Sequence, residues 1–139
     1  MPRAVVDTNI LIRALIKPRG TVGPILTQLA VGAFDLVYST LLLDELVEKL
    51  ALPRIRAKYA LDDQAIETTL ALVALRGELV QPIRAVKICR DPDDNVLIEA
   101  ALAGNAGYIV TGDADLLVLK KFETVRIVTP RVFLAVLKN

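Results

Sequence analysis

The first acidic residue of the chain stands inside an apolar run. In "AVVDTNILI", Asp7 follows three apolar residues and is separated by only Thr8 and Asn9 from three more. An ionised carboxylate in such surroundings is destabilising unless a hydrogen-bonding or charged partner compensates it. The position of Asp7 therefore raises the question of which group it faces.

Three further stretches carry acids near apolar runs: "LLLDEL", "DPDDN" and "TGDAD". In the first, Glu45 lies one helical turn after Leu41 and Leu42, which places it on or beside an apolar face, whereas Asp44 points about 100° away. From each stretch we select one acid, and the resulting candidate set is Asp7, Glu45, Asp94 and Asp113. "DPDDN" also offers Asp91, Asp93 and Asn95 as the residue that faces the site.

The chemistry open to these residues is limited because the chain has no histidine. This absence excludes Ser-His-Asp and Cys-His catalysis as well as His-ligated zinc. Four carboxylates at close range would repel one another and hold protons, whereas a divalent cation would keep them ionised. Ligation by oxygen alone favours Mg²⁺ or Mn²⁺, and the natural reaction of such a centre is metal-assisted phosphodiester hydrolysis.

The elements that must position these acids alternate along the chain. Strands are predicted over 3–7, 34–39, 78–83, 108–111 and 125–129, and helices over 9–16, 22–31, 40–52, 61–77, 91–107, 114–121 and 130–138. This alternation predicts βαβ units and an α/β fold with a mainly parallel sheet covered by helices on both faces. Residues 1–139 are expected to form one domain. Ligands bind such sheets at the carboxyl ends of the strands, where Asp7 and Asp113 fall.

Several of the acids also have a simpler interpretation as helix caps. Asp7 is a candidate cap for the helix that follows it, and Asp113 or Asp115 for the short helix beginning at 114. Asp91 precedes Pro92 and fits the capping position of its helix well. Asp94 then occupies the third helical position, where an acid is favoured by the helix dipole.

Cysteine content and hydropathy bear on location. The single cysteine, Cys89, cannot form an internal disulfide, which favours a reducing cytoplasm. No apolar stretch approaches the roughly 18–20 residues of a membrane span.

The 17 Lys and Arg residues nearly balance the 16 Asp and Glu residues, which argues against a strongly basic nucleic-acid-binding module without excluding local segregation of charge.

Four motifs together resemble the PIN-domain nucleases, and most nearly the small single-domain toxins of bacterial toxin–antitoxin pairs. The motifs are "VVDTNILI", "LLLDEL", "RDPDDNVLIEAAL" and "YIVTGDADLL", in this order and spacing. The resemblance extends from Val5 to about Val128. It implies a three-layer α/β/α sandwich with about five strands, and a Mg²⁺- or Mn²⁺-dependent endoribonuclease. It also implies a homodimer and a cognate antitoxin that blocks the site.

The resemblance assigns roles to individual residues. It makes Asp7, Glu45, Asp94 and Asp113 the four acids of the metal site, and Asp115 a frequent accessory ligand. Asn9 and Thr111 fall where the family places polar groups that orient acids or water. An RNA substrate also needs positive surface. Candidates for that surface are Lys17, Arg19, Arg54, Arg56 and Lys58, with Tyr59 beside the last of these.

Two rival functions remain open on sequence grounds. The first is a phosphatase-type hydrolase with Asp7 as nucleophile, although that class usually has a second acid where this chain has Asn9. The second is a binding module that has lost catalysis, which would be favoured if Asp94 were remote from Asp7. A dinucleotide-binding oxidoreductase is disfavoured because no G-x-G-x-x-G motif follows the first strand.

Overall fold

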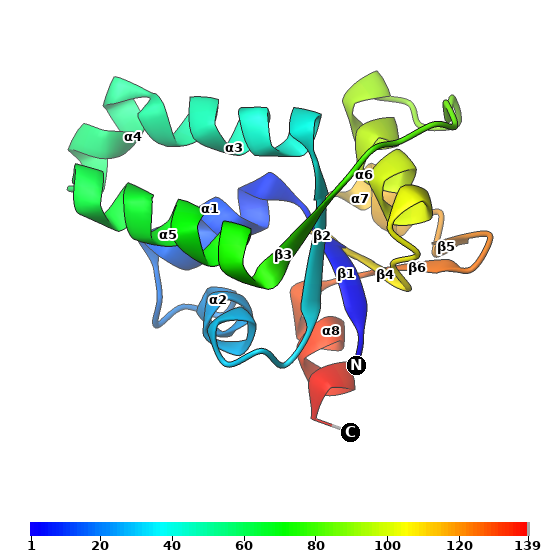
Figure 1. The fold of residues 1–139 in the computed structure, drawn as a ribbon, viewed down its shortest axis with the longest axis horizontal. Helices are drawn as coiled ribbons and strands as arrows, with labels where there is room; N and C mark the ends of the chain where they lie inside the picture. The colour runs from blue at the N-terminus through cyan, green and yellow to red at the C-terminus, as the bar shows by residue number, and fades with distance from the viewer. Residues whose placement is uncertain (139) are drawn as a thin grey trace.

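The computed structural model describes residues 1–138, which form six strands and eight helices (Figure 1). The strands are β1 (Arg3–Val6), β2 (Asp35–Ser39), β3 (Gly77–Val80), β4 (Tyr108–Val110), β5 (Lys121–Phe122) and β6 (Val125–Val128). The helices are α1 (Thr8–Ile16), α2 (Gly23–Ala30), α3 (Thr40–Ala51), α4 (Pro53–Lys58), α5 (Asp63–Arg76), α6 (Pro92–Ala103), α7 (Ala114–Leu117) and α8 (Pro130–Leu137). None of these helices has the length and apolar character needed to cross a membrane.

The strands form one sheet in the order β3-β2-β1-β4-β6-β5. All neighbouring pairs are parallel except β5 with β6. The strand order reverses direction at β1, whose neighbours are β2 and β4, with Val6 of β1 opposite Val110 of β4. Because ligands bind open α/β sheets where the strand order reverses, the carboxyl ends of β1 and β4 are the expected position of a site.

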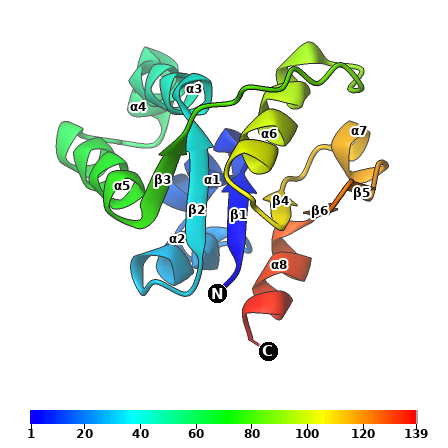
Figure 2. The same ribbon diagram turned by 45° about the vertical axis from the view of Figure 1, so that its right-hand side comes forward.

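Both faces of the sheet are covered by helices (Figures 1 and 2). Along β1, Ala4 and Val6 pack into the core with residues of α1, α2 and α8, whereas Val5 packs on the other side with α6 and α7. The central strands are therefore apolar on both faces, as buried parallel strands require. The predicted α/β/α fold with a mainly parallel sheet is confirmed.

Two elements differ from the sequence prediction. The helix predicted over 114–121 ends at Leu117, and Lys121 instead begins β5, a sixth strand of two residues. A strand this short carries no periodic pattern. The helix α4 was also not predicted: the chain is extended at Leu52 and a new helix begins at Pro53. Proline ends one helix but suits the first position of the next, so it marks a boundary without excluding helix beyond it.

Close packing of α6 on the sheet depends on Gly104. A Cβ atom at this position would lie 2.3 Å from Cγ1 of Val37, a fully buried residue of β2. We predict that Gly104→Ala lowers the free energy of unfolding by about 1–3 kcal/mol, as overpacking of a core typically does. Urea unfolding followed by circular dichroism measures the difference.

Gly107 supplies the matched control, because a Cβ atom there would have no neighbour within 4 Å. Gly107→Ala should change the free energy of unfolding by less than about 0.5 kcal/mol. Equal destabilisation by the two substitutions would contradict the packing argument.

Candidate active site

Asp7 is held at the end of β1 by contacts on both sides. Its backbone N–H donates to the Val110 carbonyl at 2.9 Å, which continues the β1–β4 pairing. Its Oδ1 accepts from the Asn9 backbone N–H at 3.1 Å and so caps α1, while Oδ2 accepts from the Thr111 hydroxyl at 2.9 Å. The capping role and a role at the site are therefore compatible, because they use different oxygens of one carboxylate.

Thr111 connects Asp7 to the second acid at this edge. The Thr111 side chain is completely buried, and its Oγ1 also accepts from the Asp113 backbone N–H at 3.1 Å. Asp113 in turn caps α7 by accepting from the Asp115 backbone N–H at 2.9 Å. One hydroxyl thus fixes the side chain of one acid and the backbone of the other.

The α6 segment contributes further acids. Asp91 caps the helix by accepting from the Asp93 backbone N–H at 3.0 Å. Asp94 is only 9% exposed, and its Oδ2 has no hydrogen-bond partner among residues 1–138. Asn95 is engaged elsewhere, since its Oδ1 accepts from the backbone N–H groups of Ile88 and Cys89. Asn95 therefore holds the preceding loop, and Asp94 is the residue with an unpaired oxygen.

Glu45 lies on α3, a helix capped by Ser39 at the end of β2. The Glu45 carboxylate is 2.7 Å from Lys49 Nζ, one turn further along the helix. Lys49 Nζ also donates to Asn9 Oδ1 on α1 at 2.9 Å. Lys49 was not among the residues selected from the sequence, although its i,i+4 spacing from Glu45 is the usual signal of such a pair.

These side chains line one hollow of about 200 Å³. Its lining residues are Asp7, Asn9, Glu45, Lys49, Asp91, Asp93, Asp94, Leu97 and Asp113. The structure thus brings together the four acids selected from the sequence, with Asn9 and Asp91 beside them. Asp93, one of the alternatives to Asp94 in the same stretch, also lines the hollow. As the side chains stand, the described residues contain no group of three acids or cysteines placed to hold one metal ion.

Other candidate residues lie outside this hollow. Asp115 Oδ1 is 3.9 Å from the Arg90 guanidinium and does not line the hollow. On α4, Arg56 pairs with Asp63, and Lys58 Nζ lies 5.3 Å from the centre of the Tyr59 ring. Arg54, the third basic residue proposed there, is exposed on the same helix.

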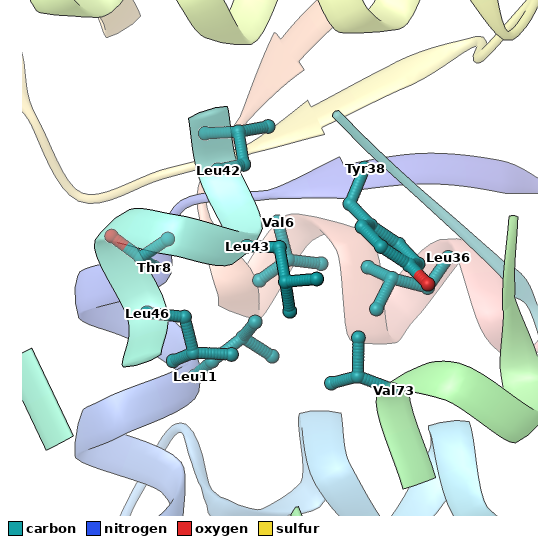
Figure 3. A pocket seen from close by; sticks show the side chains of 9 residues that line it. All are labelled: Val6, Thr8, Leu11, Leu36, Tyr38, Leu42, Leu43, Leu46 and Val73. Carbon is teal, nitrogen blue, oxygen red and sulfur yellow. The ribbon is translucent and has the colours of Figure 1, made fainter. Parts of the chain in front are cut away.

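A small, mainly apolar cavity close to the sheet is not a candidate for substrate binding. It holds only about 10 Å³ and lies among mainly apolar side chains of β1, β2, α1, α3 and α5, together with Thr8 and Tyr38 (Figure 3). That volume corresponds to one water molecule at most. The acidic hollow is therefore the better candidate for chemistry.

The crowding of acids in the hollow affects the pKa of Asp94. Burial, together with the nearby carboxylates of Asp113, Asp91 and Asp7, raises the pKa of Asp94 from 3.8 to about 6. Burial and the carboxylates of Asp94, Asp113 and Asp91 also raise the pKa of the Cys89 thiol. The hollow therefore resists additional negative charge.

The oxygen atoms that line the hollow are of the chemical type that a hard divalent cation binds. Every donor is a carboxylate or amide oxygen, which is the set that Mg²⁺ and Mn²⁺ prefer and zinc does not. Asp94 supplies a buried oxygen without a hydrogen-bond donor, and its raised pKa signals repulsion that a cation would relieve.

The raised pKa of Asp94 predicts a pH-dependent loss of stability in metal-free protein. Protonated Asp94 favours the folded state, so its contribution is complete below about pH 4 and is lost as the pH rises through about 6. We expect Asp94→Asn to exceed the wild type in free energy of unfolding by about 1–3 kcal/mol at pH 8, with the gap closing toward pH 4.

Urea unfolding in the presence of a chelator, repeated across this pH range, measures the gap. Asp44→Asn is the control, because Asp44 is exposed on α3 and does not line the hollow. Parallel pH profiles for the wild type and Asp94→Asn would contradict the inferred repulsion.

Comparison with known proteins places this site in a family. A family model described as a PIN domain matches residues 3–115, a span that includes all four selected acids. The chain is also similar to the uncharacterized protein MJ1680 of Methanocaldococcus jannaschii. The two are 34% identical over 118 residues, which cover 85% of this chain and 75% of that protein. The chain therefore belongs to the PIN domain family, whose members are generally nucleases.

Proposed function

We propose that the protein is a Mg²⁺- or Mn²⁺-dependent endoribonuclease that hydrolyses RNA phosphodiester bonds. The observation that carries this proposal is the convergence of Asp7, Glu45, Asp94 and Asp113 on one hollow from four separate segments of the chain. Membership of the PIN domain family supports nuclease chemistry. The absence of histidine supports a reaction in which carboxylates and a metal ion replace the usual general base.

Asp7, Glu45, Asp94 and Asp113 would hold the metal ion, and Asp115 is a less favoured ligand because it lies outside the hollow. When bound, the ion would activate a water molecule and stabilise negative charge on the phosphate and the leaving oxygen. Thr111 holds Asp7 in orientation through its hydroxyl group. Asp91 keeps α6 capped, so that Asp94 stays in the first turn of the helix.

Lys49 gives the acidic hollow a positive charge of its own. Its ammonium group pairs with Glu45 and reaches Asn9, so it partly neutralises the acids on the α3 side. A metal ion that uses Glu45 must compete with this contact. We infer that Lys49 lowers metal affinity and keeps Glu45 ordered when no ion is bound.

The biological role that we propose is that of a toxin in a toxin–antitoxin pair, acting in the cytoplasm. The resemblance of the four motifs to single-domain toxins supports this role, as does a single cysteine for the reducing compartment. An acidic hollow suits an antitoxin that inserts an Arg side chain, because a guanidinium pairs with carboxylates through two hydrogen bonds. A homodimer is part of the same proposal.

A phosphatase that uses Asp7 as nucleophile is the less favoured alternative. Both carboxylate oxygens of Asp7 accept hydrogen bonds, from Asn9 and Thr111, which reduces their nucleophilicity. A catalytically inactive binding module is also less favoured, because Asp94 and Asp7 line the same hollow. A phosphoenzyme trapped on Asp7 would favour the phosphatase.

The nuclease proposal predicts that Asp7→Asn abolishes metal-dependent cleavage of RNA, with a loss of at least about 100-fold in rate. Charge is lost while the shape of the side chain is retained, so the circular dichroism spectrum should not change. Cleavage of a labelled single-stranded RNA in Mn²⁺ measures the effect. Asp44→Asn on α3 should cleave as the wild type does.

Absence of RNA cleavage by the wild type in both Mg²⁺ and Mn²⁺ would overturn the proposal. Equal loss of activity in Asp7→Asn and Asp44→Asn would also count against the proposal, because it would show that removing any acidic charge is sufficient to abolish RNA cleavage.

Competition by Lys49 predicts tighter metal binding when its charge is removed. Lys49→Met keeps the apolar stem of the side chain, and we expect the Kd for Mn²⁺ measured by titration calorimetry to fall by roughly three- to tenfold. Lys58→Met, on α4 outside the hollow, is the control and should leave the Kd unchanged. Weaker Mn²⁺ binding by Lys49→Met would show that Lys49 assists the metal site.

A further inference from the structure

A second polar hollow lies beside the acidic one. It holds about 450 Å³ and is lined by Arg13, Ile16, Lys17, Gly20, Thr21, Val22 and Tyr59. Its residues come from the second half of α1, the loop that follows α1, and the end of α4. Two cationic side chains and one aromatic ring therefore share a concave surface.

Helix α1 joins the two hollows. Asn9, Arg13 and Lys17 are exposed and follow one another at intervals of four residues, so they form a stripe with steps of about 6 Å along one side of the helix. Asn9 lines the acidic hollow, and Arg13 and Lys17 line the second one.

Arg13 also reaches the loop that carries Asp113. A Cβ atom placed on Gly112 would lie 3.9 Å from the Arg13 Nη1 atom, so the guanidinium is beside the residue that precedes Asp113. The stripe thus begins with Asn9 at the wall of the acidic hollow and continues away from it through Arg13 and Lys17.

The cations of this stripe are not used inside the protein. Arg13 and Lys17 form no ion pair with any residue of the described chain, whereas Arg56 on the adjacent α4 is paired with Asp63. A free guanidinium in a concave surface suits a phosphate group, which it can bind through two hydrogen bonds.

Tyr59 adds an aromatic surface to the same hollow. It follows α4 directly and is 36% exposed, with Lys58 Nζ 5.3 Å from its ring centre. Exposed aromatic side chains beside cations are the usual means by which proteins bind single-stranded nucleic acids, since any base can stack on them.

We propose that this second hollow binds a nucleotide of single-stranded RNA that flanks the bond to be cleaved. Arg13 binds its phosphate, Lys17 binds the next phosphate along the stripe, and Tyr59 stacks on a base. This inference rests on the proposed nuclease function. It implies that the RNA strand leaves the acidic hollow along the stripe formed by Asn9, Arg13 and Lys17.

Binding is tested apart from cleavage in the Asp7→Asn protein, with a short fluorescein-labelled single-stranded RNA and fluorescence anisotropy. Adding Arg13→Ala should weaken binding about fivefold or more and reduce the slope of log K against log salt by about 0.7, the value for one phosphate contact on a single strand. Tyr59→Leu should weaken binding at least about fivefold with the salt slope unchanged, and Tyr59→Phe should restore it.

Arg131→Ala is the matched control, because Arg131 is exposed at the start of α8 and lines neither hollow. It should change RNA affinity less than about twofold. In protein that retains Asp7, Arg13→Ala and Tyr59→Leu should raise KM for RNA cleavage and leave kcat nearly unchanged.

The outcomes separate this inference from the proposed function. If the wild type cleaves RNA and the Arg13 and Tyr59 variants bind and cleave as Arg131→Ala does, the assignment of the second hollow is wrong and the nuclease proposal stands. If the wild type neither binds nor cleaves RNA, both are overturned. If Arg13→Ala lowers kcat without raising KM, Arg13 acts at the reacting phosphate and the assignment to a flanking nucleotide is wrong.

Discussion

Repulsion between the carboxylates gathered at one edge of the sheet is the constraint that the rest of this structure must accommodate. Asp94 shows it most clearly, because it is nearly buried, keeps one oxygen without a hydrogen bond, and has its pKa raised to about 6 by burial and neighbouring acids. Such an arrangement lowers the stability of the metal-free protein. Its persistence in a compact fold is most simply explained by a function that requires it.

Helix N-termini offset part of this repulsion. Asp7, Asp91 and Asp113 cap α1, α6 and α7, so each accepts a backbone N–H at the positive end of a helix. Three helices therefore begin at the edge where the acids gather. Each capping contact uses one carboxylate oxygen, and in Asp7 the second oxygen accepts from the Thr111 hydroxyl.

Much of the fold could be predicted from the sequence, because parallel strands and the helices between them have distinct patterns. The cap at Asp91 and the inward position of Glu45 followed from local spacing. The α4 helix was missed because it has only six residues and Pro53 was interpreted as the end of the preceding helix, and β5 was missed because it has only two residues. Lys49 was missed because its contact with Asn9 joins α3 to α1 across the fold, and only its pairing with Glu45 is local.

Asp94 was selected from the sequence with Asn95 left as an alternative, and the structure gives the contacts that distinguish the two. Adjacent residues on a helix point in different directions, and only the loop contacts of Asn95 show which of the two faces the acids. Of the two cations in the second hollow, Lys17 was among the basic candidates named from the sequence and Arg13 was not. Nothing local to Arg13 distinguishes it from a solvated surface residue, and only the folded chain brings it beside Tyr59.

The most direct test of the central claim is anomalous diffraction from crystals of the protein soaked in Mn²⁺. The account predicts a peak in the acidic hollow with carboxylate oxygens of Asp7, Asp94 and Asp113 among its neighbours, at ligand distances of about 2.0–2.2 Å or through one water molecule. Glu45 should turn away from Lys49 toward the ion. Crystals that show no peak in this hollow at saturating Mn²⁺, with the four carboxylates unmoved, would contradict the claim that these acids form a metal site.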